Sequence, residues 1–424
     1  MQNIMVCFDH PVGRIKPMHA VNNGPVRDRP DARENFEAYA NAGFPYARTH
    51  DAAYGEEYGG DHIVDVHNIF PDFSKDPADP ASYDFVMTDK YFRDISDAGT
   101  RVFNRLGTKI EHSIKKYGSL PPKDFQKWAV ICEHIIRHYT EGWADGLHLE
   151  IEYWEIWNEP DGYGGCWGGT MEEFFRFYHI AATHLKMKFP HLKIGGPALA
   201  GNLEWAEAFL AQLKAPLDFF SWHIYTTSPE AIVRRAAEVR CLLDKYGYTD
   251  TESILNEWNY VSGWKDGFLE SLEIIGSIKG AAFDAACMIV GQHSSIDMMM
   301  YYDARPMIWN GLFDYYTLRP KWGYYAFTMF GSLYKLGQSV ECAADGENLY
   351  AAAACGQNGK RGLMIAYYTD AENAPEKNVC IHGFDGIAEQ YLLDQNHHGD
   401  CTGTIRPADG SITIQPNTVL LLLA

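Results

Sequence analysis

Two glutamates of this chain each follow a short apolar run and an asparagine. Glu159 closes the run Tyr-Trp-Glu-Ile-Trp-Asn-Glu at 153–159, and Glu257 closes Ser-Ile-Leu-Asn-Glu at 253–257. An apolar run of this length is typical of a buried strand, so each glutamate should lie where a strand meets a loop. Cleavage of a glycosidic bond needs two carboxyl groups. One protonates the leaving oxygen, and the other attacks the anomeric carbon or activates water. The pair therefore indicates a candidate glycoside hydrolase.

The segments that must position this pair alternate between short apolar runs and amphipathic stretches, which is the pattern of βα units with a parallel sheet. Eight candidate strands are predicted at 15–21, 46–50, 101–106, 153–157, 193–196, 219–225, 253–256 and 298–302. Helical spacing predicts helices at 31–42, 84–98, 123–143, 171–189, 203–213, 229–246, 269–292 and 321–336. Eight strands and eight helices favour a (β/α)8 TIM barrel.

Polar residues gather at the carboxyl ends of the predicted strands, where a barrel of this kind builds its active site. They are His50, Asn158, Glu159, His223, Tyr225, Asn256, Glu257 and Asp303. Glu159 and Glu257 would end the fourth and seventh strands, which face each other across a barrel mouth. That placement permits the separation of about 5–5.5 Å that a retaining mechanism uses. A solvated loop glutamate is the alternative for either residue taken alone.

The pattern of apolar residues changes after about residue 337. Short alternating stretches separated by Gly, Asp, Asn and Pro predict the strands of an antiparallel β-sandwich, at 349–354, 362–368, 378–382, 389–393, 410–414 and 419–423. We therefore expect a barrel at 15–335 and a smaller sandwich at 336–424. Residues 1–14 form an N-terminal segment, within which 2–8 could add a strand to the sandwich.

Charge and cysteine usage restrict the function classes. The 424 residues include 36 basic and 56 acidic side chains, a formal net charge of −20. That balance disfavours nucleic acid and an anionic membrane as partners. Nine scattered cysteines give neither a disulfide framework nor a zinc motif. Free thiols and the absence of a basic, apolar leader at the N-terminus lead us to expect a cytoplasmic protein.

Four segments in register resemble glycoside hydrolase family 39 of clan A, which includes β-xylosidases and α-L-iduronidases. They are Arg-Thr-His at 48–50, Trp-Glu-Ile-Trp-Asn-Glu-Pro at 154–160, Lys-Ile-Gly-Gly-Pro-Ala at 193–198 and Phe-Phe-Ser-Trp-His-Ile-Tyr at 219–225. The resemblance covers roughly residues 15–330. It departs from the family's xylosidases at Trp258, where these usually carry tyrosine, and in a long loop at 51–73. Loops at this face set specificity.

The resemblance implies a role for each candidate residue. Glu159 would be the general acid/base and Glu257 the nucleophile, while Asn158 would bind the sugar 2-hydroxyl and Tyr225 would orient Glu257. His50 and His223 would line the subsite for the non-reducing sugar, although each could instead be a hydrogen-bonded structural histidine. Trp309 would form an apolar wall, a role for which Trp167, Trp258 and Trp264 compete. Asp303 could bind substrate or pair with Arg305.

The expected function is a retaining, exo-acting glycosidase for short plant-type oligosaccharides, with β-xylosidase as the leading activity. The alternatives are α-L-arabinofuranosidase, β-galactosidase, β-glucosidase, α-L-iduronidase, or a catalytically silent carbohydrate-binding barrel. The expected partner is an oligosaccharide, and the sandwich could also serve in a homo-oligomer. The two-carboxylate reaction needs no cofactor, and no HExxH-type metal motif occurs.

Overall fold

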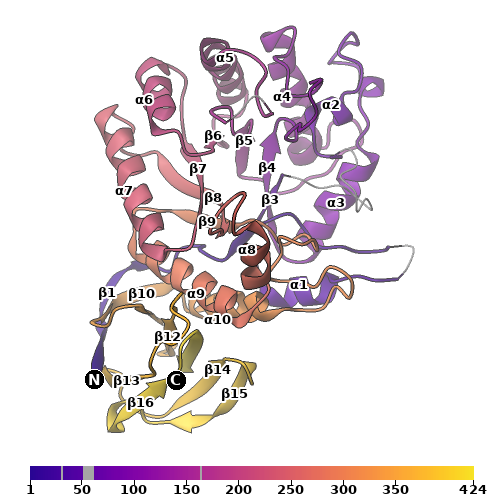
Figure 1. Cartoon of the computed structure of the whole chain (residues 1–424). Helices are drawn as coiled ribbons and strands as arrows, with labels where there is room; N and C mark the ends of the chain where they lie inside the picture. Colours follow the sequence, from indigo (N-terminus) through magenta and orange to yellow (C-terminus); the bar gives the residue numbers. More distant parts are fainter. Residues whose placement is uncertain (30–31, 51–61, 163–164) are drawn as a thin grey trace.

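The computed structural model describes residues 1–29, 32–50, 62–162 and 165–424. Its larger part is a closed barrel of eight parallel strands (Figure 1), which confirms the predicted fold class. The barrel strands follow the chain in order: β2 (Ala20–Asn22), β3 (Tyr46–Thr49), β4 (Arg101–Leu106), β5 (Tyr153–Ile156), β6 (Lys193–Leu199), β7 (Phe219–Thr226), β8 (Glu252–Tyr260) and β9 (Met298–Tyr301).

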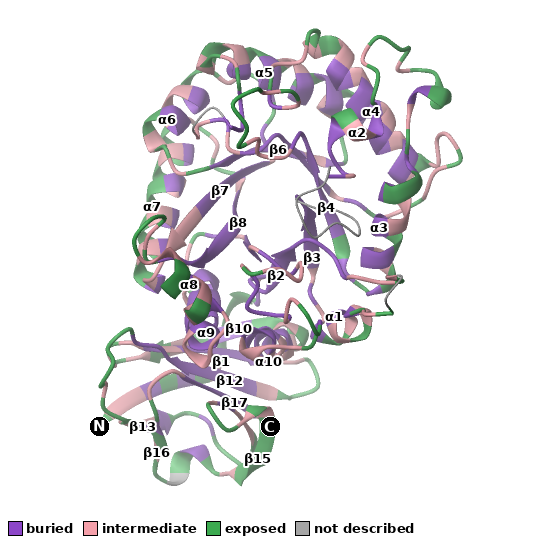
Figure 2. Ribbon diagram, turned by 45° about the vertical axis from the view of Figure 1, so that its right-hand side comes forward, coloured by how far each residue is buried: buried purple, intermediate pink, exposed green. Residues whose placement is uncertain are grey.

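Helices surround the barrel and bury apolar stripes against it, and most of them expose their outer faces (Figure 2). They are α1 (Phe36–Ala42), α2 (Val66–Ile69), α3 (Val86–Asp97), α4 (Phe125–Glu141), α5 (Met171–Lys188), α6 (Leu203–Gln212), α7 (Pro229–Lys245), α8 (Phe268–Ile275), α9 (Ile278–His293) and α10 (Trp322–Leu336), with one 3-10 turn at Pro80–Ser82. In contrast to the other helices, α9 and α10 are covered on the outside by the accessory sheet, which is the smaller part of the molecule.

The single helix predicted at 269–292 is wrong, because this stretch forms α8 and α9 with a bend of 81° between them. Ser277 begins α9 by accepting a hydrogen bond from the amide of Gly280. The end of α8 then packs so closely on Gly280 that a Cβ there would lie 2.3 Å from the carbonyl oxygen of Ile274. The spacing of apolar residues alone does not reveal such a break, because both helices have buried residues and the apolar pattern continues across the bend.

The amino-terminal end of the barrel is filled by apolar side chains that point inward from most of its strands. These are Ala20, Tyr46, Phe103, Tyr153, Phe219, Ile254, Met298 and Met300. The layer above them is polar and includes Arg48, Glu155 and Ser221, all fully buried. The barrel is therefore plugged below and polar above, so that its chemistry is confined to the carboxyl end.

The smaller part is one nine-stranded sheet with the strand order β15-β14-β17-β12-β11-β10-β1-β13-β16. The strands are β1 (Gln2–Arg14), β10 (Gln338–Ala344), β11 (Leu349–Cys355), β12 (Arg361–Tyr367), β13 (Lys377–His382), β14 (Ala388–Leu393), β15 (His398–Ile405), β16 (Ser411–Ile414) and β17 (Thr418–Leu423), with a 3-10 turn at Pro407–Asp409. β1 runs antiparallel to β10 and parallel to β13. The sheet curls so that Ile4, Val379, Ile414 and Leu422 share one core.

Two helices belong to both parts of the molecule. α9 and α10 cover the barrel, and they also pack on the outer face of the accessory sheet (Figures 1 and 2), where Ala352, Met364 and Leu421 continue the barrel's hydrophobic core. The domain limits predicted at residues 15 and 336 stay predictions.

Within the described residues, no single helix is long and apolar enough to cross a membrane. The helices α8 and α9 reach the required length and apolar character only when they are counted together, and a bend of 81° separates them.

Candidate active site

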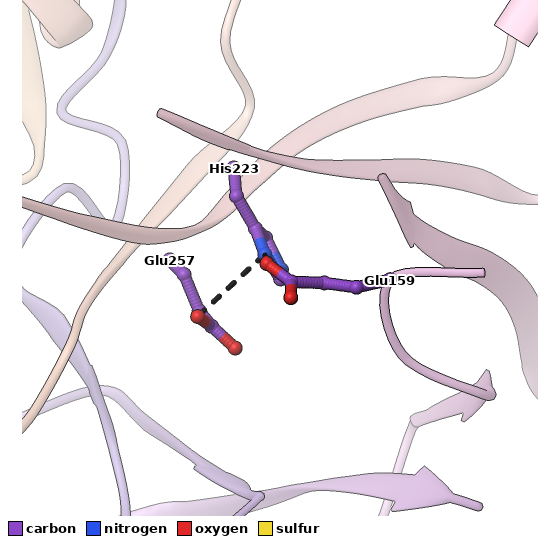
Figure 3. Close-up of side chains that lie close together, drawn as sticks. All are labelled: Glu159, His223 and Glu257. Carbon is purple, nitrogen blue, oxygen red and sulfur yellow. Dashed lines mark hydrogen bonds and ion pairs between the residues drawn. The ribbon is translucent and has the colours of Figure 1, made fainter. Parts of the chain in front are cut away.

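Glu159 and Glu257 face each other at the carboxyl end of the barrel. Glu159 lies three residues beyond β5, the fourth barrel strand, and Glu257 lies within β8, the seventh. One carboxyl oxygen of each residue and a ring nitrogen of His223 all lie within 4.8 Å of one another. Figure 3 shows the three side chains converging on one point. Glu257 is almost completely buried, whereas the Glu159 side chain keeps 19% of its surface exposed.

The segment that carries Glu159 departs from strand geometry at two residues. Trp157 has φ 76° and Glu159 has φ 46°, values that side-chain-bearing residues rarely adopt. Trp157 turns outward and packs against Trp128 and Phe177 near α4 and α5, and its indole N–H donates to the carbonyl of Cys166 at 2.8 Å. This aromatic anchor holds the strained turn, which points Asn158 and Glu159 into the barrel mouth.

A β-bulge aims Glu257. The pairing of β7 with β8 slips between Trp222 and His223, so that His223 lies beside Glu257 and Asn256 has no counterpart. Side chains of a regular strand alternate between faces, but the bulge lets two successive residues point inward. Asn256 hydrogen-bonds Glu155 within the barrel, and Glu257 lies directly above it. Trp258 then points outward.

Arg48 connects the polar layer to the segments that carry Glu159 and Glu257. It is fully buried, and its guanidinium donates to Glu155 at 2.6 Å, to Glu257 at 2.8 Å and to the Asn158 side-chain oxygen at 2.8 Å. Burial alone would lower the pKa of Arg48, but Glu155 and Glu257 outweigh burial and raise it. The guanidinium therefore stays charged and stabilises the ionised form of Glu257.

His223 lies between the two glutamates. Its Nδ1 is 2.8 Å from Oε1 of Glu159 and 3.6 Å from Oε2 of Glu257. Burial would lower the pKa of His223, but the negative charge of Glu257 and the hydrogen bond with Glu159 raise it overall. The second oxygen of Glu159 lies 3.8 Å from the buried thiol of Cys166. Burial and the two nearby glutamates raise the pKa of Cys166, so this thiol stays protonated.

Tyr225 and His50 complete the surroundings of Glu257. The Tyr225 hydroxyl donates to Oε2 of Glu257 at 2.8 Å, and burial together with Glu257 raises the pKa of Tyr225 far above its ordinary value. Nε2 of His50 is 3.3 Å from the other oxygen. Tyr225 therefore remains a neutral donor at every pH of interest.

The structure separates the tryptophans that competed for the apolar wall. Trp309 and Trp264 lie near Tyr225, with ring centroids 5.9 and 5.2 Å from it. Trp258 is buried outside the barrel against Tyr301 and Phe327. Trp167 packs into the core formed by α5 and Trp157. Neither Trp258 nor Trp167 reaches the mouth, so the alternative that either forms the wall is wrong.

Residues 10–251 match the sequence profile of glycosyl hydrolases family 39. The chain belongs to family 39. The matched range includes Glu159 and His223 but ends before Glu257, so the position of Glu257 beside its partners rests on the structure.

Individual relatives resemble this family 39 protein over limited segments. A β-xylosidase of Geobacillus stearothermophilus is 36% identical over 113 residues, which cover 25% of this chain and 22% of that protein. A β-xylosidase of Caldicellulosiruptor saccharolyticus is 32% identical over 165 residues, covering 34% and 32%. These alignments span less than a third of the curated relatives. A crystal structure of a glucosidase from Croceicoccus marinus superposes with a TM-score of 0.79 over 100% of this chain and 98% of that one, at 24% identity. This last similarity shows the fold.

Arg48 and Cys166 contact Glu257 and Glu159, although the sequence did not predict either of them as a site residue. Arg48 was visible only as part of the Arg-Thr-His segment, and an arginine inside a strand gives no indication of which carboxylates it will meet. Asp303, which the sequence predicts either to bind substrate or to pair with Arg305, lies 3.6 Å from the guanidinium of Arg305 and in contact with Asn23. The part of the predicted 51–73 loop at 51–61 lies outside the described residues.

Glu159, His223 and Glu257 also form a grouping, within the described part of the chain, whose ligand atoms are close enough to hold a metal ion. The surroundings disfavour a cation there. Arg48 already places a positive charge 2.8 Å from Glu257, and the raised pKa of His223 favours its protonated form, which cannot ligate metal. That this family 39 protein needs no cofactor stays a prediction.

Proposed function

We infer that this chain is a retaining glycoside hydrolase that releases single sugars from the ends of short oligosaccharides, with β-xylosidase activity. The observation that carries this proposal is that one carboxyl oxygen of Glu159 lies within 4.8 Å of one carboxyl oxygen of Glu257. Retaining glycosidases hold their two carboxyl groups about 5–5.5 Å apart, whereas inverting enzymes leave about 6.5–9.5 Å for a water molecule. The distance between the carboxyl oxygens of Glu159 and Glu257 therefore suits direct attack of Glu257 on the anomeric carbon.

The proposed reaction has two displacements. Glu159, as general acid, protonates the leaving oxygen while Glu257 attacks the anomeric carbon and forms a glycosyl-enzyme. Glu159 then removes a proton from water, which attacks the same carbon and releases the sugar with its original configuration. Asn158 has its side-chain oxygen engaged by Arg48, so its NH2 group is oriented to donate to a sugar hydroxyl next to the reacting carbon.

The environments of the two glutamates differ in the way that these roles require. Glu257 receives hydrogen bonds from Arg48 and Tyr225, which stabilise a carboxylate and hold it on target. Among the described residues, His223 is the cation that contacts Glu159, and the other oxygen of Glu159 faces the neutral thiol of Cys166. It is also the more exposed of the two, as a group that exchanges protons with water should be.

Support for xylose as the released sugar comes from the two β-xylosidases that match parts of this chain. A uronate substrate would need a cation available for its carboxylate. Arg48 is committed to Glu155 and Glu257, and Arg305 lies beside Asp303. These pairings favour a neutral sugar over the uronate of an α-L-iduronidase.

The roles of the two glutamates can be separated with an activated aryl β-xyloside. Glu257→Ala should abolish turnover. Glu159→Ala should lower kcat by about 10²–10⁴-fold, and added azide should restore turnover and yield the β-xylosyl azide, identified by NMR. Glu152→Gln is a matched control, because Glu152 lies at the opposite end of β5. Wild-type rates in Glu257→Ala, or an α-azide product, would contradict the retaining assignment.

The sugar itself is tested with a panel of p-nitrophenyl glycosides: β-xyloside, β-glucoside, β-galactoside and α-L-arabinofuranoside. We expect the highest kcat/KM for the β-xyloside. A higher value for another member would keep the mechanism and replace the substrate.

A further inference from the structure

An aromatic surface leads outward from Glu257 to solvent. It consists of Tyr225, Trp309, Trp264 and Phe268, which we call the aromatic ledge. Trp264 has 62% of its surface exposed, which is unusual for the largest apolar side chain. The ring centroids of Trp264 and Trp309 are 5.7 Å apart, and those of Phe268 and Trp309 are 5.2 Å apart.

The ledge is continuous with the catalytic centre. The hydroxyl of Tyr225 donates to Glu257, and the ring of Tyr225 contacts Trp264 at 5.2 Å and Trp309 at 5.9 Å. One end of the ledge therefore touches the proposed nucleophile, while the other lies in solvent. An exposed apolar surface that begins in a reaction centre is typical of a ligand-binding surface.

The loop that presents Trp264 is held in place by hydrogen bonds to the start of α8. The amide of Ser262 donates to Oγ of Ser271 at 3.0 Å, and the Ser262 hydroxyl donates to the carbonyl of Gly267 at 3.1 Å. The turn between them is tight, since a Cβ on Gly263 would lie 2.2 Å from the carbonyl oxygen of Asp266. Trp264 is thus exposed on a braced turn, where a rigid platform needs no ordering when a ligand binds.

We propose that the aromatic ledge is the leaving-group subsite and stacks against the second sugar ring of a β-linked oligosaccharide. This rests on the proposed function: in an exo-acting enzyme the terminal sugar occupies the polar pocket of Arg48, Asn158 and His50, so every further ring lies on the leaving side. A pyranose ring with equatorial substituents exposes an apolar C–H face, which complements an indole plane. The ledge selects substrates whose leaving group is itself a ring.

The test compares two substrates that share a sugar and differ in the leaving group. Xylobiose carries a second ring, whereas β-D-xylosyl fluoride has none. In Trp264→Ala, the ratio of kcat/KM for xylobiose to kcat/KM for the fluoride should fall about three- to tenfold, the contribution expected of one aromatic contact. Trp264→Phe should recover part of that loss, because it restores a smaller ring.

Leu269→Ala provides the matched control. Leu269 follows Phe268 on α8 and is 74% exposed, so its loss should leave the ratio at the wild-type value. An unchanged ratio in Trp264→Ala, or an equal fall in Leu269→Ala, would overturn the ledge as a subsite. The proposed function is judged separately, by whether the wild-type protein cleaves the fluoride; if it cleaves neither substrate, the proposed function and the ledge both fail.

Discussion

A chain of ionisable groups runs through the barrel mouth, each within 3.6 Å of the next: Glu155, Arg48, Glu257, His223 and Glu159. Moving one proton between His223 and Glu159 leaves their total charge unchanged. The pair can therefore hold a single proton in two arrangements of equal charge, separated by a hydrogen bond of 2.8 Å. In the proposed reaction, this is the proton that reaches the leaving oxygen.

His223 gives a stability prediction with a defined sign. Its pKa is raised in the folded protein, so protonation of His223 stabilises the fold. That contribution is complete below the unfolded value of about 6.5 and disappears as the pH rises through the folded pKa. The difference in unfolding free energy between wild type and His223→Gln should be larger at pH 5.5 than at pH 9, measured by urea denaturation.

His19 supplies the control of opposite sign. It is buried against Phe330 and Tyr334, and burial lowers its pKa to about 3. The wild-type advantage over His19→Gln should therefore shrink as the pH falls below about 6.5. If both variants show the same slope, His223 is not held in its protonated form.

At the level of elements, the bulge in β8 explains which parts of the site could be predicted. The strand ends were predictable, because each functional residue follows an apolar run, and Glu159, Glu257, His223 and Tyr225 meet as the barrel topology requires. Which of the competing tryptophans lies at the barrel mouth could not be predicted. Alternation from Ile254 would point Asn256 and Trp258 inward, but the bulge turns Glu257 in and Trp258 out. No local feature of the sequence marks that slip.

The same limit applies to the strands of the accessory sheet. Six of its strands were predicted from alternation, while β10 and β15 were not. Exposed residues fill most positions of β15, so it shows no apolar alternation, and its place in the sheet comes from pairing with β14. Pairing is a tertiary interaction, and a single sequence does not display it.

The break between α8 and α9 depends on one hydroxyl. Ser277 caps α9, and its hydroxyl also donates to the carbonyl of Ile274 at the end of α8, at 2.7 Å. Ser277→Ala should lower the free energy of unfolding by about 1 kcal/mol, a fall in Tm on the order of 1 °C for a chain of this length, measured by calorimetry. Ser332→Ala in α10 is the control, because that hydroxyl donates only to a carbonyl one turn earlier; an equal fall there would contradict a capping role.

For the whole molecule, the shared helices α9 and α10 suggest that barrel and accessory sheet unfold together. Ile4 of β1 lies in the core of the accessory sheet and is fully buried, whereas its neighbour Met5 is 56% exposed. Ile4→Ala should lower the free energy of unfolding by about 2–5 kcal/mol, and Met5→Ala by less than about 0.5 kcal/mol. Calorimetry should show one transition in each protein, and loss of glycosidase activity should follow the same curve.

Two separate transitions in Ile4→Ala, with activity lost only in the second, would show instead that the barrel stands without the sheet. That outcome would also give experimental support to the domain limits predicted at residues 15 and 336.

The position of β1 constrains how a ribosome can produce this protein. β1 is made before the barrel, yet Ile4 pairs with Ala344 on one side and Ile381 on the other. While the barrel is being synthesised, β1 has neither neighbour and presents open hydrogen-bonding groups on both edges, a hazard for association with other chains. The far end of β1 carries the exposed charged and polar residues Asp9, His10 and Arg14. Such residues disfavour pairing with other chains until β10 and β13 have been synthesised.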